Sequence, residues 1–204
     1  MEKILYISKE YRIAFTRVFG AAFLFLLLFS GYSWSPNIYM HLAVDLVAFV
    51  LILVCTFGRL WALAYISGHK TKDLITDGPY SLVRNPLYLF SLIGAFGVGL
   101  VSKNVVVFAL ILILFVIYYP FVIRAEEKHL LEVHGHTFEE YKAKTPMFIP
   151  NFKGFKEQQY YSIDARLFRR AFFSVTWFPL IYMILLAIDR LHVSGLVPVL
   201  FTVP

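Results

Sequence analysis

The chain has 204 residues, of which 59% are hydrophobic and 16% are charged. Soluble domains are about 45–50% apolar and about 25% charged, so this composition excludes a water-soluble globule and indicates a single membrane domain over residues 1–204. The net charge of +6 is spread between apolar runs and forms no single patch, which argues against a nucleic-acid partner. The only cysteine, Cys55, lies within an apolar run, which excludes an intrachain disulfide and a cysteine-rich metal site.

Several apolar runs are long enough to cross a bilayer. A membrane-spanning helix needs roughly 20 apolar residues, because hydrocarbon offers no partner for exposed backbone groups. The third run is short and rich in glycine, and a tight connection at Lys103 and Asn104 joins it to the fourth, which predicts a helical hairpin. We therefore expect an all-α polytopic transmembrane bundle of about five spans, at residues 13–29, 38–66, 87–101, 105–123 and 171–188.

The distribution of basic residues predicts the orientation of these spans. Of the 19 lysines and arginines, 17 fall on one side of the five-span arrangement, and only Lys103 and Arg190 fall on the other. Cytoplasmic loops carry an excess of such residues, so we expect the N-terminus, the 67–86 loop and the 124–170 segment in the cytoplasm. The absence of glycosylation sequons and disulfides favours a bacterial plasma membrane over an endoplasmic reticulum.

The segment after the fourth span has the pattern of an amphipathic helix. Apolar positions recur at helical spacing from Arg124 to Tyr141, with an interruption at Gly135. Pro146 and Pro150 then end regular structure. We expect a cytoplasmic helical cap that continues the fourth span.

Two cytoplasmic stretches contain residue patterns typical of a functional site. Residues 77–88 read DGPYSLVRNPLY, in which Gly-Pro and Asn-Pro fix two turns. Residues 124–131 read RAEEKHLL and place two adjacent carboxylates just past a span. Charged carboxylates are energetically unfavourable there unless they are solvated, paired with a cation or part of a functional site. A rigid interfacial loop and a solvated helix would explain these stretches without function, and the residues alone leave that interpretation open.

Together, GPYSLVRNPLYL and the later EEKHLLEVHGHTFEEYKAKTPMFIP resemble the superfamily of isoprenylcysteine carboxyl methyltransferases and phospholipid methyltransferases. The resemblance covers roughly residues 65–150 and leaves the additional C-terminal span, residues 171–190, outside it. It implies an integral membrane enzyme that uses S-adenosyl-L-methionine (SAM) without the soluble Rossmann-like fold. It also implies a cytoplasmic cofactor pocket under the helical cap, and a lipophilic substrate that enters from the bilayer.

The resemblance also implies roles for individual residues. By motif position, Glu126 would hold the amino-acid end of the cofactor. The aromatic faces of Tyr80 and Tyr88 can attract its sulfonium, at ~0.5–2 kcal/mol each. Arg124 and Glu127 are the candidate catalytic residues, which would orient the acceptor. The other residues that would lie along the cofactor are Tyr65, Lys72, Asp73, Leu74, Ile75, Asn85, Pro86 and Leu87.

The chain departs from the family pattern at several positions. The usual Arg-His-Pro has Asn85 in place of the histidine, and asparagine cannot act as a base near neutral pH. The upstream histidine position carries Lys72, and the arginine that grips the substrate carboxylate in the prenylcysteine enzymes is replaced by Val122. Arg124 lies two residues on, about 200° around a helix, so it does not simply replace that arginine. The cofactor half of the resemblance survives these changes, whereas the half that is specific to prenylcysteine substrates does not.

The expected function is SAM-dependent methyl transfer to a lipophilic, membrane-associated acceptor. An isoprenylcysteine-like carboxylate, a phospholipid amine and a thiol all remain open as the acceptor, and the sequence leaves the oligomeric state open as well. One alternative is an NADPH-dependent membrane reductase of the sterol type, and another is a non-catalytic membrane protein. Binding of NADPH in place of SAM would favour the reductase.

Three polar features of the chain have weaker functional interpretations. Asp45 and Arg59 fall within the second predicted span, where Asp45 is a candidate for a polar pathway and Arg59 can extend its charge to the interface. His134 and His136 flank Gly135, but no third ligand stands at a spacing typical of a metal site. We therefore expect no bound metal.

Overall fold

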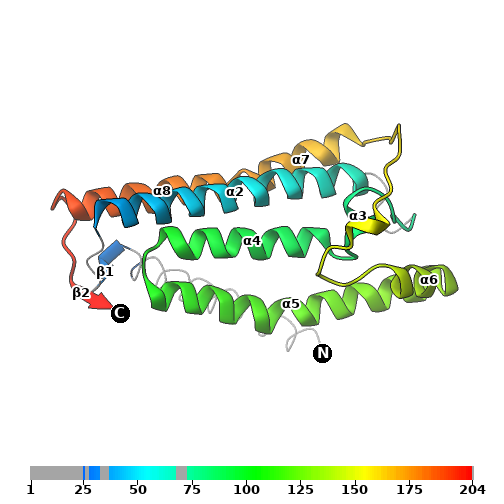
Figure 1. Cartoon of the computed structure of the whole chain (residues 1–204), viewed down its shortest axis with the longest axis horizontal. Helices are drawn as coiled ribbons and strands as arrows, with labels where there is room; N and C mark the ends of the chain where they lie inside the picture. Colours follow the sequence, from blue (N-terminus) through cyan, green and yellow to red (C-terminus); the bar gives the residue numbers. More distant parts are fainter. Residues whose placement is uncertain (1–24, 26–27, 33–36, 68–72, 204) are drawn as a thin grey trace, which may run out of the picture.

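The computed structural model describes residues 25, 28–32, 37–67 and 73–203. Long helices run side by side along the long axis of the molecule (Figure 1). They are α2 (Ile38–Ile66), α4 (Pro86–Val101), α5 (Val105–His134), α7 (Ala165–Val175) and α8 (Trp177–Val193). Short elements lie at the two ends: α3 (Pro79–Leu82), α6 (His136–Lys144) and the 3-10 helix η1 (Phe152–Gly154) at one, and β1 (Ser30–Tyr32) and β2 (Phe201–Val203) at the other.

The helices begin where the sequence supplies capping residues. The side chains of Asn37, Asn104 and Asp164 accept hydrogen bonds from amides in the first turns of α2, α5 and α7. Asparagine and aspartate are favoured there because they satisfy amides that have no partner within the helix. Pro79 and Pro86 stand at the start of α3 and α4, where the missing N–H removes no helical hydrogen bond.

Among the described residues, three helical stretches are long and apolar enough to cross a membrane. They are residues 38–66, residues 105–134 and the run of α7 and α8 at residues 165–193. α4 is apolar but shorter, at 16 residues. The helix predicted for the second span and the predicted hairpin of α4 and α5 are confirmed, whereas the predicted first span, residues 13–29, lies almost wholly outside the described residues.

The prediction that a helix continues past the fourth span is also confirmed. α5 is unbroken to His134, and α6 follows after Gly135. Gly135 has φ of +50°, a conformation that glycine adopts without a steric penalty. The predicted fifth span is longer than expected and is divided at Thr176 into α7 and α8.

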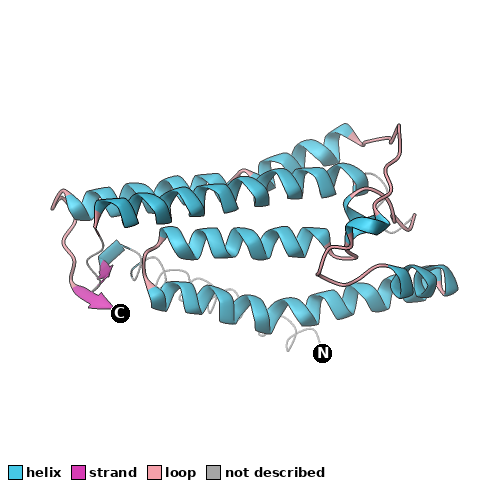
Figure 2. Cartoon of the chain, in the orientation of Figure 1, coloured by secondary structure: helices cyan, strands magenta, loops and turns pink. Residues whose placement is uncertain are grey.

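One feature differs from the all-α expectation. β1 and β2 form a two-stranded parallel sheet in which Ser30 lies opposite Phe201 (Figure 2). The pairing brings together segments from near the two ends of the chain. Apart from this small sheet and the loops, the elements of the described residues are helical.

Close packing of α2 against α4 forms the centre of the bundle. A Cβ added to Gly94 would lie 2.5 Å from Cys55 Sγ, and one added to Gly97 would lie 3.1 Å from the carbonyl oxygen of Ala48. Small residues at these positions therefore let the two helix backbones approach closely. α8 packs on both helices, and the buried cluster at their contact consists of Ala48, Ile52, Val101, Tyr182 and Leu185.

Candidate functional site

A cavity of about 310 Å³ lies at the end of the bundle that carries α3 and α6. Its walls come from α2, the 73–75 segment, the α3–α4 junction, α5 and α6. This volume is at the lower end of the range of about 300–1,000 Å³ typical of small-molecule sites. The lining residues are Arg59, Ile66, Asp73, Leu74, Ile75, Tyr80, Arg84, Asn85, Pro86, Leu87, Tyr88, Ser91, Tyr119, Glu126, Leu130 and Tyr141.

The α3–α4 junction is held in place by two Xaa-Pro turns. Gly78, with φ of +59°, precedes Pro79, and Asn85 precedes Pro86. The Ser81 hydroxyl donates to the Gly78 carbonyl at 2.7 Å, which closes the first of these turns. Since proline restricts both itself and the residue before it, the junction presents its side chains to the cavity in a fixed arrangement.

Glu126 of α5 provides a carboxylate in the cavity wall. The hydroxyl of Tyr88 on α4 donates to Glu126 Oε2 at 2.8 Å. The Tyr88 ring also lies edge-on to Tyr119 of α5, with ring centroids 5.3 Å apart. These contacts join α4 to α5 across the cavity and fix both an acidic and an aromatic group in its wall.

The neighbouring carboxylate, Glu127, is engaged differently. It is buried and accepts from Arg84 Nε at 3.1 Å and from Asn85 Nδ2 at 3.3 Å, while Lys142 Nζ lies 3.7 Å away. Arg84 Nη1 also donates to the carbonyls of Lys142 at 2.9 Å and Thr145 at 2.7 Å. This network joins the α3–α4 junction to α5 and α6 and so holds the helical cap over the cavity.

Replacement of Arg84 with lysine tests this network. Lysine keeps the charge but lacks the planar guanidinium, which here reaches Glu127 and two carbonyls at once. We expect a loss of about 1–2 kcal/mol in local stability, measured as faster hydrogen exchange in residues 136–150. Arg166→Lys on the exposed face of α7 is the control. Unchanged exchange in Arg84→Lys would show that the network does not hold the cap.

Arg59 of α2 places a positive charge in the cavity wall. Its Nη1 donates to Ser91 Oγ and, at 3.4 Å, to the carbonyl of Leu87, and its guanidinium lies 5.4 Å from the ring centre of Phe178. Arg59 Nε is buried without a hydrogen-bond partner among the described residues, and no described carboxylate pairs with the guanidinium. Buried donors normally have partners, so the cavity offers a place for an anionic or polar ligand group.

Two buried tyrosines complete the wall under the cap. The hydroxyl of Tyr141 on α6 donates to the backbone carbonyl of Tyr80 at 2.7 Å. Burial raises the pKa of Tyr80 well above its ordinary value, and the Glu126 carboxylate raises it further. Burial likewise raises the pKa of Tyr141, although Arg84 opposes this. Both phenols are therefore neutral at physiological pH and offer ring faces and hydroxyl groups instead of phenolate charge.

Most of the residues expected along the cofactor line this one cavity. Tyr65 does not, and Lys72 lies outside the described residues. Of the two candidate catalytic residues, Arg124 is exposed and does not line the cavity, and Glu127 is bound within the Arg84 network. The expected residues that do line it are Asp73, Leu74, Ile75, Tyr80, Asn85, Pro86, Leu87, Tyr88 and Glu126.

Several residues that line the cavity were not predicted from the sequence. Tyr119 and Leu130 stand seven residues before and four after Glu126, spacings that put them on one helix face. That periodicity was a usable signal. Arg59 and Ser91 had no such signal, because their meeting depends on how α2 packs against α4.

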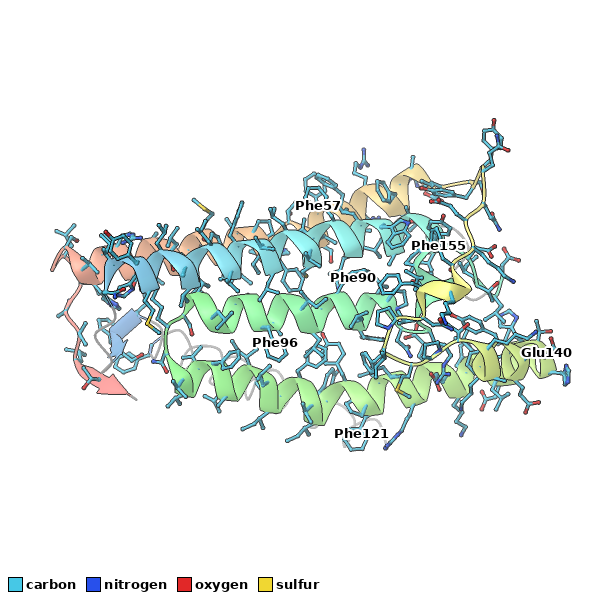
Figure 3. The ribbon with its side chains drawn as sticks, in the orientation of Figure 1. Phe57, Phe90, Phe96, Phe121, Glu140 and Phe155 are labelled. Carbon is cyan, nitrogen blue, oxygen red and sulfur yellow. The ribbon has the colours of Figure 1, made fainter. Side chains whose placement is uncertain are left out.

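The aromatic residues of the bundle are divided between its interior and its outer surface. Figure 3 shows Phe90 between α2 and α4, and Phe57 and Phe121 on the outer faces of α2 and α5. Phe57 is 64% exposed and Phe121 is 66% exposed. Large exposed apolar residues on long apolar helices fit a lipid-facing surface, so the cavity lies at one end of a bundle suited to a bilayer.

Comparison with known proteins identifies related chains. The phospholipid methyltransferase family matches residues 39–137. The nickel-cobalt-cadmium resistance protein NccN of Alcaligenes xylosoxydans xylosoxydans is 33% identical over 169 residues, which are 83% of this chain and 78% of that protein. The cobalt-zinc-cadmium resistance protein CzcN of Cupriavidus metallidurans is 32% identical over 193 residues, 95% of this chain and 88% of that protein.

A third relative is named as an enzyme. The protein-S-isoprenylcysteine O-methyltransferase of Schizosaccharomyces pombe is 32% identical over 87 residues, 42% of this chain and 37% of that protein. No solved structure matches the chain. With relatives that align over most of its length and a family match that spans α2 to α5, this chain belongs to the phospholipid methyltransferase family and is distantly related to isoprenylcysteine O-methyltransferase.

Proposed function

We propose that this protein is a SAM-dependent methyltransferase that acts on a lipophilic, membrane-associated acceptor, with its active site facing the cytoplasm. The observation that carries the proposal is one cavity that unites the two separated motif segments. The Asn85–Tyr88 run precedes the hairpin and Glu126 follows it, yet both line the same space. Family membership supports the same reaction class.

The residues of the cavity fit the charged parts of SAM. When bound, SAM supplies an electrophilic methyl group on a sulfonium. Glu126 offers a carboxylate for the ammonium of its amino-acid end, through a charge-assisted hydrogen bond. The neutral rings of Tyr80 and Tyr88 offer π faces for the sulfonium, worth ~0.5–2 kcal/mol each. Arg84 and Glu127 would act indirectly, by keeping the cap closed against water.

In this proposal catalysis is mainly a matter of alignment. Methyl transfer from a sulfonium disperses charge instead of creating it, so donor and acceptor need correct placement more than they need a strong base. Asn85 cannot supply a base, and Glu127 is already paired with Arg84. A direct catalytic role for Arg124 or Glu127 therefore stays a prediction.

Arg59 supplies the positive charge that a carboxylate or phosphate group of a reactant would meet. It lies seven residues before the end of α2, or about 10 Å at 1.5 Å per residue. Glutamine at this position removes the charge, and we expect at least a tenfold loss of methyl transfer. Weaker SAM binding in Arg59→Gln would assign the charge to the cofactor carboxylate. Unchanged SAM binding with a raised KM for the acceptor would assign it to an anionic acceptor, and unchanged turnover would contradict both roles.

In this proposal the whole chain forms a single membrane domain of about five spans, which lies in a bacterial membrane. The exposed apolar faces of α2 and α5 support access of the acceptor from lipid. The names of the two metal-resistance relatives state no reaction, so they carry no weight for or against methyl transfer.

Calorimetric titration of the detergent-purified protein with SAM tests the proposal against its alternatives. We expect saturable SAM binding and no binding of NADPH. A folded protein that binds NADPH and not SAM would support a membrane reductase. Binding of SAM without turnover on any lipid extract would support a non-catalytic protein.

A further inference from the structure

The helix α7 carries a group of three arginines on its outward side. Arg166, Arg169 and Arg170 stand three and four residues apart, and all three are exposed. Residues at these spacings are neighbours on a helix surface. The least exposed residue of α7, Val175, lies on the opposite side of the helix, and α7 packs on α2. The arginines therefore face away from the bundle.

The position of these arginines along the last helical run places them at the level of lipid headgroups. The residues that follow them, 171–188, include no lysine, arginine, aspartate or glutamate. These 18 residues span about 27 Å at 1.5 Å per residue, close to the hydrocarbon thickness of about 30 Å. Phe173 and Trp177 are exposed one to two turns after the arginines on the same side, and tryptophan is common at membrane interfaces.

The arginine group is electrostatically unfavourable for the helix that carries it. It lies in the first half of α7, where the positive end of the helix dipole disfavours cations. Like charges three or four residues apart also repel each other. Asp164 at the N-cap offers one negative charge, but no carboxylate in the described part of the chain pairs with any of the three arginines. Local conflicts of this kind are expected at functional sites, and an external anion would relieve this one.

We infer that this face of α7 binds the headgroup of an anionic phospholipid. A guanidinium can donate two parallel hydrogen bonds to phosphate oxygens, and anionic lipids attract basic residues next to a membrane span. The acyl chains would lie along Phe173, Trp177 and the exposed apolar side of α8.

Other occupants fit this face less well. A second copy of the chain that packed through the same face would bring three more arginines against the first three. A soluble acidic partner would satisfy the charges but would not reach the exposed rings of Phe173 and Trp177, which lie at the depth of the hydrocarbon. A phospholipid supplies the anion and the apolar chains in one molecule.

The lipid site is separate from the candidate active site. Figure 1 shows α7 towards the end of the bundle that carries α3. None of the three arginines lines the cavity, and α7 lies beyond the family match at residues 39–137. The inference therefore stands or falls independently of methyl transfer.

Hydrogen exchange in lipid nanodiscs tests the inference on the full-length protein. In wild type, the amides of residues 165–175 are expected to exchange at least about fivefold more slowly in phosphatidylcholine with phosphatidylglycerol than in phosphatidylcholine alone. The triple variant Arg166→Gln, Arg169→Gln, Arg170→Gln should lose this difference. Because the variant also lacks the repulsion, its α7 should exchange no faster than that of wild type in pure phosphatidylcholine.

A second triple variant controls for the loss of net charge. Lys128→Gln, Lys144→Gln and Lys153→Gln together remove three positive charges from exposed lysines outside α7, and should leave the effect of phosphatidylglycerol on α7 as in wild type. An equal loss in this control would show a general surface attraction and would overturn the inference.

Three further results would also overturn the inference. One is slowing by phosphatidylglycerol that persists in the arginine variant. Another is equal slowing by inorganic phosphate in pure phosphatidylcholine, which would point to a soluble anion. The third is wild-type protein that ignores phosphatidylglycerol and forms dimers that the arginine variant loses, which would assign the face to a second copy.

Discussion

Replacement of Glu126 with glutamine is expected to weaken SAM binding about 10- to 150-fold, the range that corresponds to a charge-assisted hydrogen bond of about 1.5–3 kcal/mol. Glutamine has nearly the same size, and its carbonyl oxygen can still accept from the Tyr88 hydroxyl. What the variant loses is the negative charge that would pair with the cofactor ammonium. Calorimetric titration with SAM measures the effect directly.

The same helix supplies a matched control for this variant. Glu132 is a 62% exposed carboxylate on α5 that pairs only loosely with Lys128, at 3.9 Å. Glu132→Gln makes the same chemical change outside the cavity and should leave the affinity for SAM unchanged. Equal affinities for wild type and a folded Glu126→Gln variant would remove Glu126 from the cofactor site.

Replacement of Lys103 with methionine is expected to lower the free energy of unfolding by about 3–5 kcal/mol, the usual result of removing one partner from a buried ion pair. Lys103 Nζ lies 3.0 Å from Asp45 Oδ1 and 2.7 Å from Asp189 Oδ2, and its side chain is 1% exposed. Arg190 is a further, largely exposed partner of Asp45 at 3.4 Å. Without Lys103, two buried carboxylates would lose their central cation.

This cluster joins the α4–α5 hairpin to α2 and α8 at the end of the bundle opposite the cavity. Thermal unfolding in detergent, followed by circular dichroism, measures its contribution. Lys128→Met removes a lysine that is 79% exposed, and surface pairs contribute only about 0–1 kcal/mol. If the unfolding temperature of Lys103→Met fell no further than that of Lys128→Met, the cluster would not stabilise the bundle.

The sequence predicts most of the architecture because its signals are local. The run 38–66 becomes α2 with the same bounds, since an asparagine cap precedes an unbroken apolar stretch. The hairpin follows from a short polar connection between two apolar runs. The part of the cavity wall formed by Tyr80 and Asn85–Tyr88 is also predictable from local sequence, because two prolines fix the backbone there.

Features that depend on contacts between distant segments could not be predicted. Lys103 is 58 residues from Asp45 and 86 residues from Asp189, and no local pattern marks their pairing. From the sequence, the side chain of Arg59 is expected to extend to the membrane–water interface. In the structure, its hydrogen-bond partners are Leu87 and Ser91 of α4. The interruption of the last helical run at Thr176 was also not predicted, although it has a local cause: Pro179 cannot donate a hydrogen bond to the carbonyl of Val175, four residues earlier.

A direct assay of methyl transfer tests the proposed function. Purified protein would be reconstituted in liposomes of bacterial lipid extract and incubated with methyl-labelled SAM, and label in the organic phase would be counted over time. We expect steady transfer of label into the lipid fraction, and a strongly reduced rate for Glu126→Gln. If folded wild-type protein leaves the label in the aqueous phase with lipophilic carboxylate, amine and thiol acceptors alike, the proposed methyl transfer is contradicted.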